Sequence, residues 1–117
     1  MYPIPRTKIR QIAVGDGHIV FCNEDGTVYT QGNNDFGQLG RFTKATNDSQ
    51  FATIPTLEGK PIKKVGAGSN FTVFLSNRGL ILTCGSSLYG CLGHGINDDV
   101  ETPRIVEGQS KLLIVKR

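Results

Sequence analysis

Glycines that recur at a fixed offset constrain this fold more than any other feature of the sequence. Five glycines in the first half of the chain each have a partner 53 positions later. The pairs are Gly15 and Gly68, Gly26 and Gly79, Gly32 and Gly85, Gly37 and Gly90, and Gly40 and Gly93. Glycines at regular intervals are typical of repeated backbone turns rather than of flexible linkers. The chain is therefore predicted to contain two copies of one structural unit.

Other residues repeat at the same offset. Residues 9–40 and 62–93 share ten identical positions without a gap, where composition alone would give roughly two or three. Ile9 and Ile62 are one such pair, and Phe21 and Phe74 are another. A period near 50 residues lies in the range of propeller blades, each of which is a four-stranded antiparallel sheet.

Each unit contains enough strand-forming segments for one blade. Residues 8–14, 18–22 and 27–30 are rich in apolar and β-branched side chains, and Asn-Glu-Asp-Gly at 23–26 supplies a turn. We expect the fourth strand at residues 53–57, with its counterpart at 102–107. No window has helical periodicity over three turns. The sequence predicts an all-β fold of two four-stranded antiparallel blades of a β-propeller, with an incomplete ring.

The expected division of the chain follows the duplication. Residues 1–61 form the first blade, residues 62–110 form the second, and residues 111–117 are either the start of a third repeat or a tail. Two blades leave sheet faces without neighbours, whereas stacked repeats generally need three or more copies for stability. Either this chain is a fragment of a longer propeller, or several copies assemble as a homo-oligomer to complete a ring.

The glycine spacing also resembles the regulator of chromosome condensation repeat. Residues 25–32 read Asp-Gly-Thr-Val-Tyr-Thr-Gln-Gly, and residues 36–40 read Phe-Gly-Gln-Leu-Gly. The second copy at 78–85 and 89–93 is weaker, and residues 89–95 faintly resemble the C-terminal repeats of NIMA-related kinases. Gln31 and Cys84 replace a frequent tryptophan, while the usual histidine is kept as His18 and replaced by Phe71. The resemblance implies propeller blades.

Residues that could carry chemistry are few. The three cysteines, Cys22, Cys84 and Cys91, lack the spacing of a zinc or redox motif, and Cys22 and His18 are expected in a packed core because the second copy has apolar residues there. No serine or threonine has a histidine and an acid nearby in sequence, and no phosphate-binding glycine motif occurs. We expect no metal, no cofactor and no enzymatic activity.

The two copies differ most in the segment before the fourth strand. This segment spans residues 41–54 in the first copy and the shorter 94–102 in the second. Extra loop length on one repeat often serves binding. Arg41, Phe42, Lys44 and Asp48 are the candidate partner-binding residues, and the alternative is a disordered insertion without a role.

These features favour a non-catalytic protein-protein interaction module or scaffold. The formal net charge of +3 is below that typical of a nucleic-acid-binding surface, which leaves nucleic acid as a weaker alternative. The sequence shows no secretory signal and no apolar stretch of membrane-spanning length, so we expect an intracellular protein, cytoplasmic or nuclear, without a membrane partner. The family resemblance implies one alternative, a guanine nucleotide exchange factor for a Ran-type small GTPase. The basic residues before the first strand of each copy suggest another alternative, a chromatin-binding module.

Overall fold

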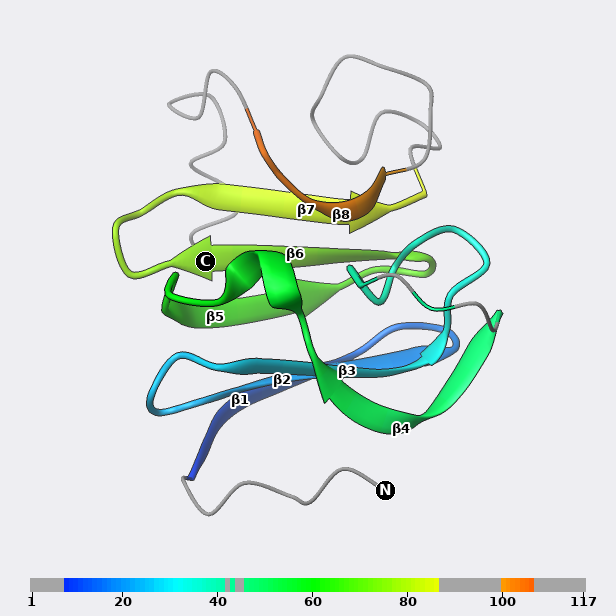
Figure 1. The fold of residues 1–117 in the computed structure, drawn as a ribbon, viewed down its shortest axis with the longest axis horizontal. Coiled ribbons are helices and arrows are strands. Elements are labelled where there is room, and N and C mark those ends of the chain that lie inside the picture. The colour runs from blue at the N-terminus through cyan, green and yellow to red at the C-terminus, as the bar shows by residue number, and fades with distance from the viewer. Residues whose placement is uncertain (1–7, 42, 44–45, 87–99, 107–117) are drawn as a thin grey trace.

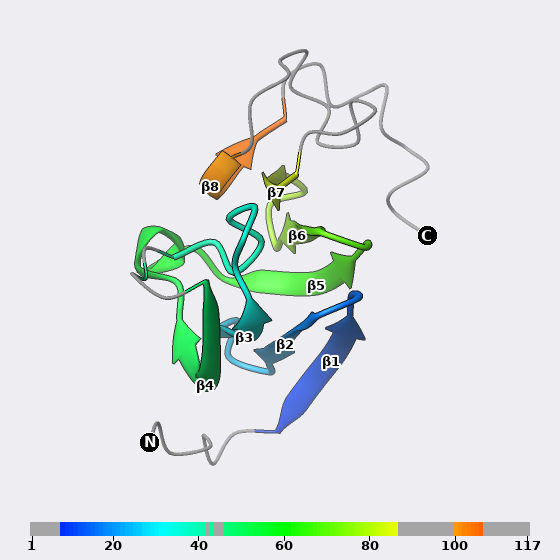
Figure 2. The same cartoon turned by 90° about the vertical axis from the view of Figure 1, so that its right-hand side faces the viewer.

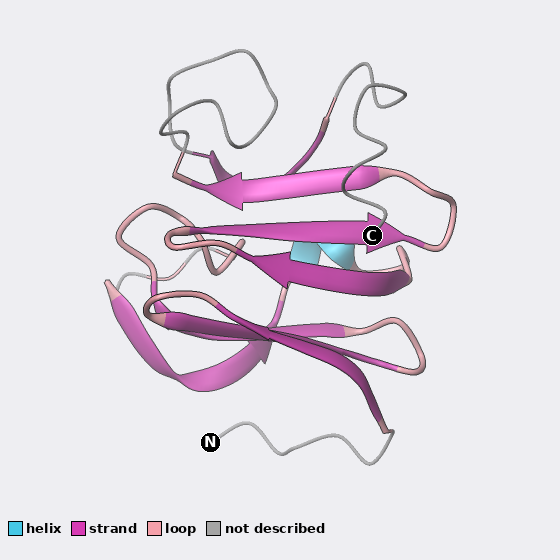
Figure 3. Ribbon diagram, turned by 180° about the vertical axis from the view of Figure 1, so that it is seen from behind, coloured by secondary structure: helices cyan, strands magenta, loops and turns pink. Residues whose placement is uncertain are grey.

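The computed structural model describes residues 8–41, 43, 46–86 and 100–106, and these are almost entirely β-structure. Two sheets follow one another along the chain (Figure 1). The first contains β1 (Ile9–Val14), β2 (His18–Asn23), β3 (Val28–Asn33) and β4 (Asn47–Thr53). The second contains β5 (Ile62–Ala67), β6 (Phe71–Ser76), β7 (Ile81–Gly85) and β8 (Val100–Ile105). One turn of 3₁₀ helix, η1 (Pro55–Leu57), lies between them (Figure 3).

Each sheet is an antiparallel meander whose strands pair in the order of the sequence. The two sheets, called blade 1 and blade 2 from here on, pack face to face with β1 beside β5. Figure 2 shows β4 and β8 at the opposite ends of their sheets from β1 and β5. This is the arrangement of adjacent propeller blades, and it confirms the predicted all-β fold with an open ring.

Corresponding residues form equivalent rows across the two sheets. Ile12, Phe21 and Tyr29 are cross-strand neighbours in blade 1. Val65, Phe74 and Leu82, 53 positions later, are cross-strand neighbours in blade 2. Because side chains alternate between the faces of a strand, each row lies on one face of its blade. This face is called the front face, and the opposite one is called the rear face.

The main hydrophobic core lies between the rear face of blade 1 and the front face of blade 2. Blade 1 contributes Val20, Cys22 and Val28, and Ile54 and Leu57 follow from the segment after β4. Blade 2 contributes Ile62, Val65, Phe74, Leu82 and Cys84. Burial of these side chains removes apolar surface from water and holds the blades together.

The position predicted for the fourth strand of blade 1 is wrong. The strand β4 spans Asn47–Thr53, and the predicted segment instead contains η1, with Pro55 in its first turn. Proline fits the first turn of a helix because its missing N–H has no partner there. Residues 47–53 therefore belong to the sheet and are not a disordered insertion.

The fourth strand of blade 2 is close to its predicted position. The strand β8 spans Val100–Ile105, and Pro103 lies in this edge strand, where a missing donor is tolerated. The boundary between repeats at residues 61 and 62 falls in the link before β5 and stays a prediction, as does the boundary at 110. Residues 107–117 lie outside the described part of the chain.

Candidate interaction surface

A buried polar network links the two blades. The His18 Nε2 atom lies 2.9 Å from Thr72 Oγ1, and the Thr72 hydroxyl donates to the Gln38 carbonyl oxygen at 2.6 Å. The Cys84 thiol lies 3.6 Å from the same carbonyl. Because buried polar groups are costly without partners, these contacts specify how blade 2 sits on blade 1.

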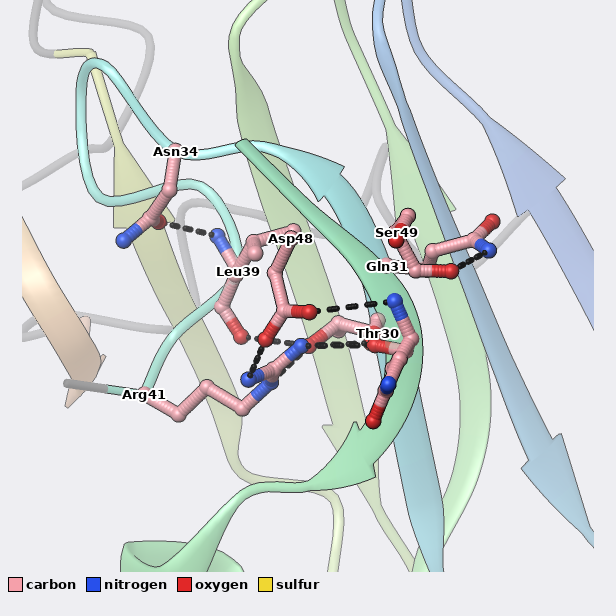
Figure 4. A network of polar contacts seen from close by, with 8 residues as sticks. Thr30, Gln31, Asn34, Leu39, Arg41, Asp48 and Ser49 are labelled. Atoms are coloured by element: carbon pink, nitrogen blue, oxygen red, sulfur yellow. Dashed lines mark hydrogen bonds and ion pairs between the residues drawn. The ribbon is translucent and has the colours of Figure 1, made fainter. Parts of the chain in front are cut away.

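The loop after β3 is closely packed. Gln38 is fully buried, and its side-chain oxygen accepts a hydrogen bond from the backbone N–H of Phe36. Asn34 Oδ1 accepts from the backbone N–H of Leu39, and the Thr30 hydroxyl donates to the Leu39 carbonyl oxygen (Figure 4). The Phe-Gly-Gln-Leu-Gly motif thus forms a fixed loop whose Gln38 carbonyl group reaches the interface between the blades.

Arg41 fixes the far side of this loop to β3 and β4. Its guanidinium donates to Asp48 Oδ2 at 2.8 Å, to Thr30 Oγ1 and to the carbonyl oxygens of Thr30 and Gln50 (Figure 4). The pairing of β3 with β4 is irregular between Thr30 and Gly32. Arg41 therefore supplies donors to carbonyl groups where the regular ladder is interrupted.

The contacts of Arg41 with Asp48, Thr30 and Gln50 are called the Arg41 clamp from here on, and the electrostatics of the clamp follow from its geometry. The Arg41 side chain is only 8% exposed, whereas that of Asp48 is 26% exposed. Hydrogen bonding to Arg41 lowers the pKa of Asp48 from its usual value, and a bond from the Gln50 backbone acts in the same direction. Arg41 and Asp48 are thus engaged with each other and with the backbone.

The four predicted partner-binding residues therefore fall into two groups. Arg41, in the segment that joins β3 to β4, and Asp48, on β4, form an ion pair with each other. Phe42 and Lys44 lie outside the described residues. No contact with a partner tests these four residues, and their binding role stays a prediction. The Arg41 clamp was missed from the sequence because its partners come from β3 and β4, seven or more positions away.

The candidates for chemistry are structural where the structure describes them. His18, Cys22 and Cys84 are buried, and Cys91 and His94 lie outside the described residues. In the part of the chain that is described, no three His, Cys, Asp or Glu side chains cluster to hold a metal ion. Over the same residues, no helix has the length and apolar character needed to cross a bilayer.

A surface hollow of about 430 Å³ lies where the β2–β3 turn meets η1 and the link to β5. Asp25, Glu58 and Lys60 are its ionisable lining residues, and the lining contains no histidine or cysteine.

Aliphatic side chains on the front face of blade 1 are exposed, whereas the equivalent side chains of blade 2 are buried. Ile9, Ile12 and Val14 of β1 are 48%, 56% and 65% exposed. Their counterparts in β5 are Ile62 at 1%, Val65 at 7% and the partly buried Ala67, all packed against blade 1 or its core. An exposed row of this kind is typical of an interaction surface.

An open stack of four-stranded antiparallel blades packed face to face defines a β-propeller repeat protein. Residues 9–38 and 62–91, about half of the chain, match the regulator of chromosome condensation (RCC1) repeat. A second family model of the same repeat matches residues 25–75. The chain belongs to the family of proteins built from regulator of chromosome condensation repeats, as its glycine spacing predicts.

Curated relatives are much longer than this chain. It is 37% identical over 105 residues to the E3 ubiquitin-protein ligase HERC2 of Homo sapiens, which is 86% of this chain and 2% of that protein. It is 35% identical over 89 residues to the secretion-regulating guanine nucleotide exchange factor of Mus musculus, which is 74% of this chain and 19% of that protein. The chain therefore spans less than a fifth of the length of either relative.

A solved structure supports the fold. Prp20p of Saccharomyces cerevisiae superposes with a TM-score of 0.78 at 22% identity, over 92% of this chain and 28% of that one. Prp20p is a protein with binding properties to Gsp1p and histones. At this identity the likeness shows a shared propeller architecture.

Proposed function

We propose that this chain is a non-catalytic protein-protein interaction module of a longer intracellular propeller protein, cytoplasmic or nuclear. The observation that carries the proposal is the clamp between Arg41 and Asp48 at 2.8 Å. It ties Arg41, at the start of the extra segment of blade 1, to Asp48 on β4. Binding loops are commonly presented in this way on a rigid scaffold. Phe42 and Lys44, which lie between Arg41 and Asp48 in the sequence, are the proposed contact residues.

The proposed partner is a protein, with a small GTPase as the first candidate. Support comes from Prp20p, which shares the propeller architecture and has binding properties to Gsp1p. The basic Lys44 and the aromatic Phe42 are residue types that suit an acidic protein surface with an apolar pocket.

The test is a titration of this chain against Gsp1p, with the Phe42→Ala/Lys44→Glu double variant beside it. We expect binding by the unaltered chain at concentrations up to about 100 μM, and at least tenfold weaker binding by the double variant, a loss of about 1.4 kcal/mol or more. Lys63→Ala, an exposed cation on β5, is the control and should bind normally. Absence of binding, or equal binding by the double variant, would refute the proposed site.

Guanine nucleotide exchange is the second candidate function, because the 35% identical mouse relative is named as an exchange factor. The two functions separate in one assay, in which Gsp1p loaded with fluorescent GDP is mixed with this chain. An interaction module leaves the rate of GDP release unchanged, whereas an exchange factor accelerates it. Acceleration by this chain would replace the first proposal with the second.

Chromatin binding is the remaining alternative, and exposed basic residues on β1 and β5 favour it. Arg10 on β1 and Lys63 and Lys64 on β5 are exposed. Nucleosome binding that weakens steeply as salt rises would support this function, because each neutralised phosphate releases counterions. No binding at low salt would exclude it.

A further inference from the structure

The hollow beside the β2–β3 turn has an apolar floor that belongs to the main hydrophobic core. Val28, Ile54 and Leu57 line it, and they are only 3%, 3% and 7% exposed. The more exposed Pro55 and Pro61 add further apolar lining. The volume of about 430 Å³ lies within the range of about 300–1,000 Å³ that is typical of ligand pockets. The hollow is therefore large enough to receive a side chain from another molecule.

The walls of the hollow are held in place by backbone hydrogen bonds. The Gly26 N–H donates to the Asn23 carbonyl oxygen, and the Gly26 carbonyl oxygen accepts from the Ile62 N–H, both at 3.0 Å. In η1, the Leu57 N–H donates to the Ile54 carbonyl oxygen, also at 3.0 Å. Because these walls are already ordered, little conformational freedom is lost when a ligand enters.

Three charged side chains line the hollow without being paired. Asp25, Glu58 and Lys60 are exposed, and none of them forms an ion pair among the described residues. Asp25 Oδ1 accepts from the Thr27 N–H at 2.9 Å, which leaves its second carboxylate oxygen for a ligand. Two carboxylates and one ammonium group leave the hollow with a net negative charge, whereas the whole chain has a formal net charge of +3. The hollow therefore favours a cationic ligand.

The fold of the repeat does not require an acid in this turn. Arg78 stands at the position of blade 2 that is equivalent to Asp25. The backbone is nevertheless similar in the two turns, since φ is +90° at Gly26 and +85° at Gly79. The acidic hollow is thus a property of blade 1 at its junction with the link to β5.

An arginine side chain fits this combination of groups better than a lysine side chain. Asp25 lies in the β2–β3 turn and Glu58 follows η1, so the two carboxylates belong to different walls. A guanidinium group is planar, has five N–H donors and is more weakly hydrated than an ammonium group. Its methylene stem can lie along the apolar floor. Lys60 repels either cation, and it lowers the affinity for both.

We infer that this hollow binds an arginine side chain of a protein partner. The site lies at the end of the blades that is on the left in Figure 1, where the β2–β3 turn is found. It is formed by segments within and between the two described blades. The inference uses neither Phe42 nor Lys44, so it stands or falls separately from the proposed partner loop.

The test is a titration of the isotope-labelled chain with a capped pentapeptide that has arginine between two pairs of alanines. We expect the backbone amide resonances of Gly26, Thr27 and Gly59 to shift, because these residues line the hollow. The amides of Gly17 and Gly68 should not shift, because they lie in the turns at the other end of the blades. A dissociation constant of about 1–10 mM is expected for a single side chain.

Two further peptides separate charge from shape. Citrulline keeps the shape of arginine without its charge, and lysine keeps the charge without the planar set of donors. Relative to the arginine peptide, we expect binding about tenfold weaker or more for the citrulline peptide and about threefold weaker for the lysine peptide.

A matched pair of variants locates the charge. Glu58→Gln removes a carboxylate of the hollow at an exposed position and should weaken binding of the arginine peptide about fivefold or more. Glu24→Gln removes the same charge from an exposed residue outside the lining, and it should bind like the wild type. The amide spectrum of each variant also shows whether it is folded.

The opposite results are equally clear. Unchanged resonances at Gly26, Thr27 and Gly59 up to about 20 mM peptide would overturn the inference. Equal binding of the citrulline peptide, or equal weakening by the two substitutions, would show that the hollow does not recognise charge and would overturn it as well. Equal or tighter binding of the lysine peptide would overturn the assignment of arginine.

Discussion

The His18 Nε2 atom and the Thr72 hydroxyl oxygen lie 2.9 Å apart across the contact between the blades. The single hydroxyl hydrogen of Thr72 is donated to the Gln38 carbonyl oxygen, so the hydroxyl oxygen accepts from the His18 Nε2–H. The neutral form of His18 therefore carries its proton on Nε2. Its Nδ1 atom is buried and has no hydrogen-bond partner.

This arrangement makes the stability of the fold depend on pH. Burial lowers the pKa of His18 below its usual value of 6.5, and the weaker effects of the Phe71 backbone and the Asp16 charge oppose the shift. The unfolded chain therefore binds the proton more readily than the folded chain, and the free energy of unfolding falls as pH drops below about 6.5. The effect levels off once the folded histidine also titrates.

His18→Phe should remove this pH dependence, since phenylalanine occupies the equivalent position 71. Urea unfolding at about pH 7.5 and pH 5 measures it. The wild type should lose more stability than His18→Phe between the two values. An equal loss in both proteins would contradict the lowered pKa of His18.

Arg41→Met should destabilise the protein by about 3 kcal/mol, because it leaves the Thr30 and Gln50 carbonyl groups without their donor. Asp48→Asn removes only the ion pair at the more exposed end, and about 1 kcal/mol is expected. Chemical denaturation compares the two. Because the pKa of Asp48 is lowered in the folded state, its stabilising effect is present at neutral pH and is lost in acid. A larger effect from Asp48→Asn than from Arg41→Met would contradict this account of the clamp.

Gly32→Ala should cost about 3 kcal/mol or more. Gly32 has a φ of +118°, and a Cβ there would lie 2.4 Å from the Gly17 carbonyl oxygen. Gly79 has a similar φ of +85° with open space around it, so Gly79→Ala carries only the conformational penalty, about 1 kcal/mol. Thermal unfolding distinguishes the two. Equal losses would mean that the contact with Gly17 is unimportant.

The thiols of Cys22 and Cys84 should resist modification in the folded protein. Burial raises the pKa of both above the ordinary thiol value, and the thiolate is the reactive form. With Cys91→Ser as the background, labelling by an aromatic disulfide should be at least about 100-fold slower than in denaturant. Fast labelling of either thiol without denaturant would show that the core between the blades opens readily.

Much of this fold could be predicted from the sequence. The glycine pairs and the matched apolar rows predict two equivalent sheets because one backbone geometry repeats at one offset. The strand β4 could not be found in the same way. Apolar and polar residues do not alternate strictly in β4, and the segment before it differs in length between the two copies. Its pairing with β3 also depends on hydrogen bonds from Arg41.

The sequence predicts which residues are equivalent in the two blades, but it does not predict which residues meet between them. The sequence places His18 and Phe71 at equivalent positions, and it does the same for Ile19 and Thr72. It does not show that His18 reaches Thr72, because that contact joins positions 54 residues apart across two sheets. Such a bond follows from how the blades pack, and periodicity does not contain that information.

The packing of blade 2 against blade 1 is the central claim, and a nuclear Overhauser spectrum of the monomer tests it most directly. The account predicts cross-peaks between the His18 ring protons and the Thr72 side chain, together with cross-peaks between Val20 and Phe74. A spectrum with the expected contacts within each blade and none between the blades would contradict it.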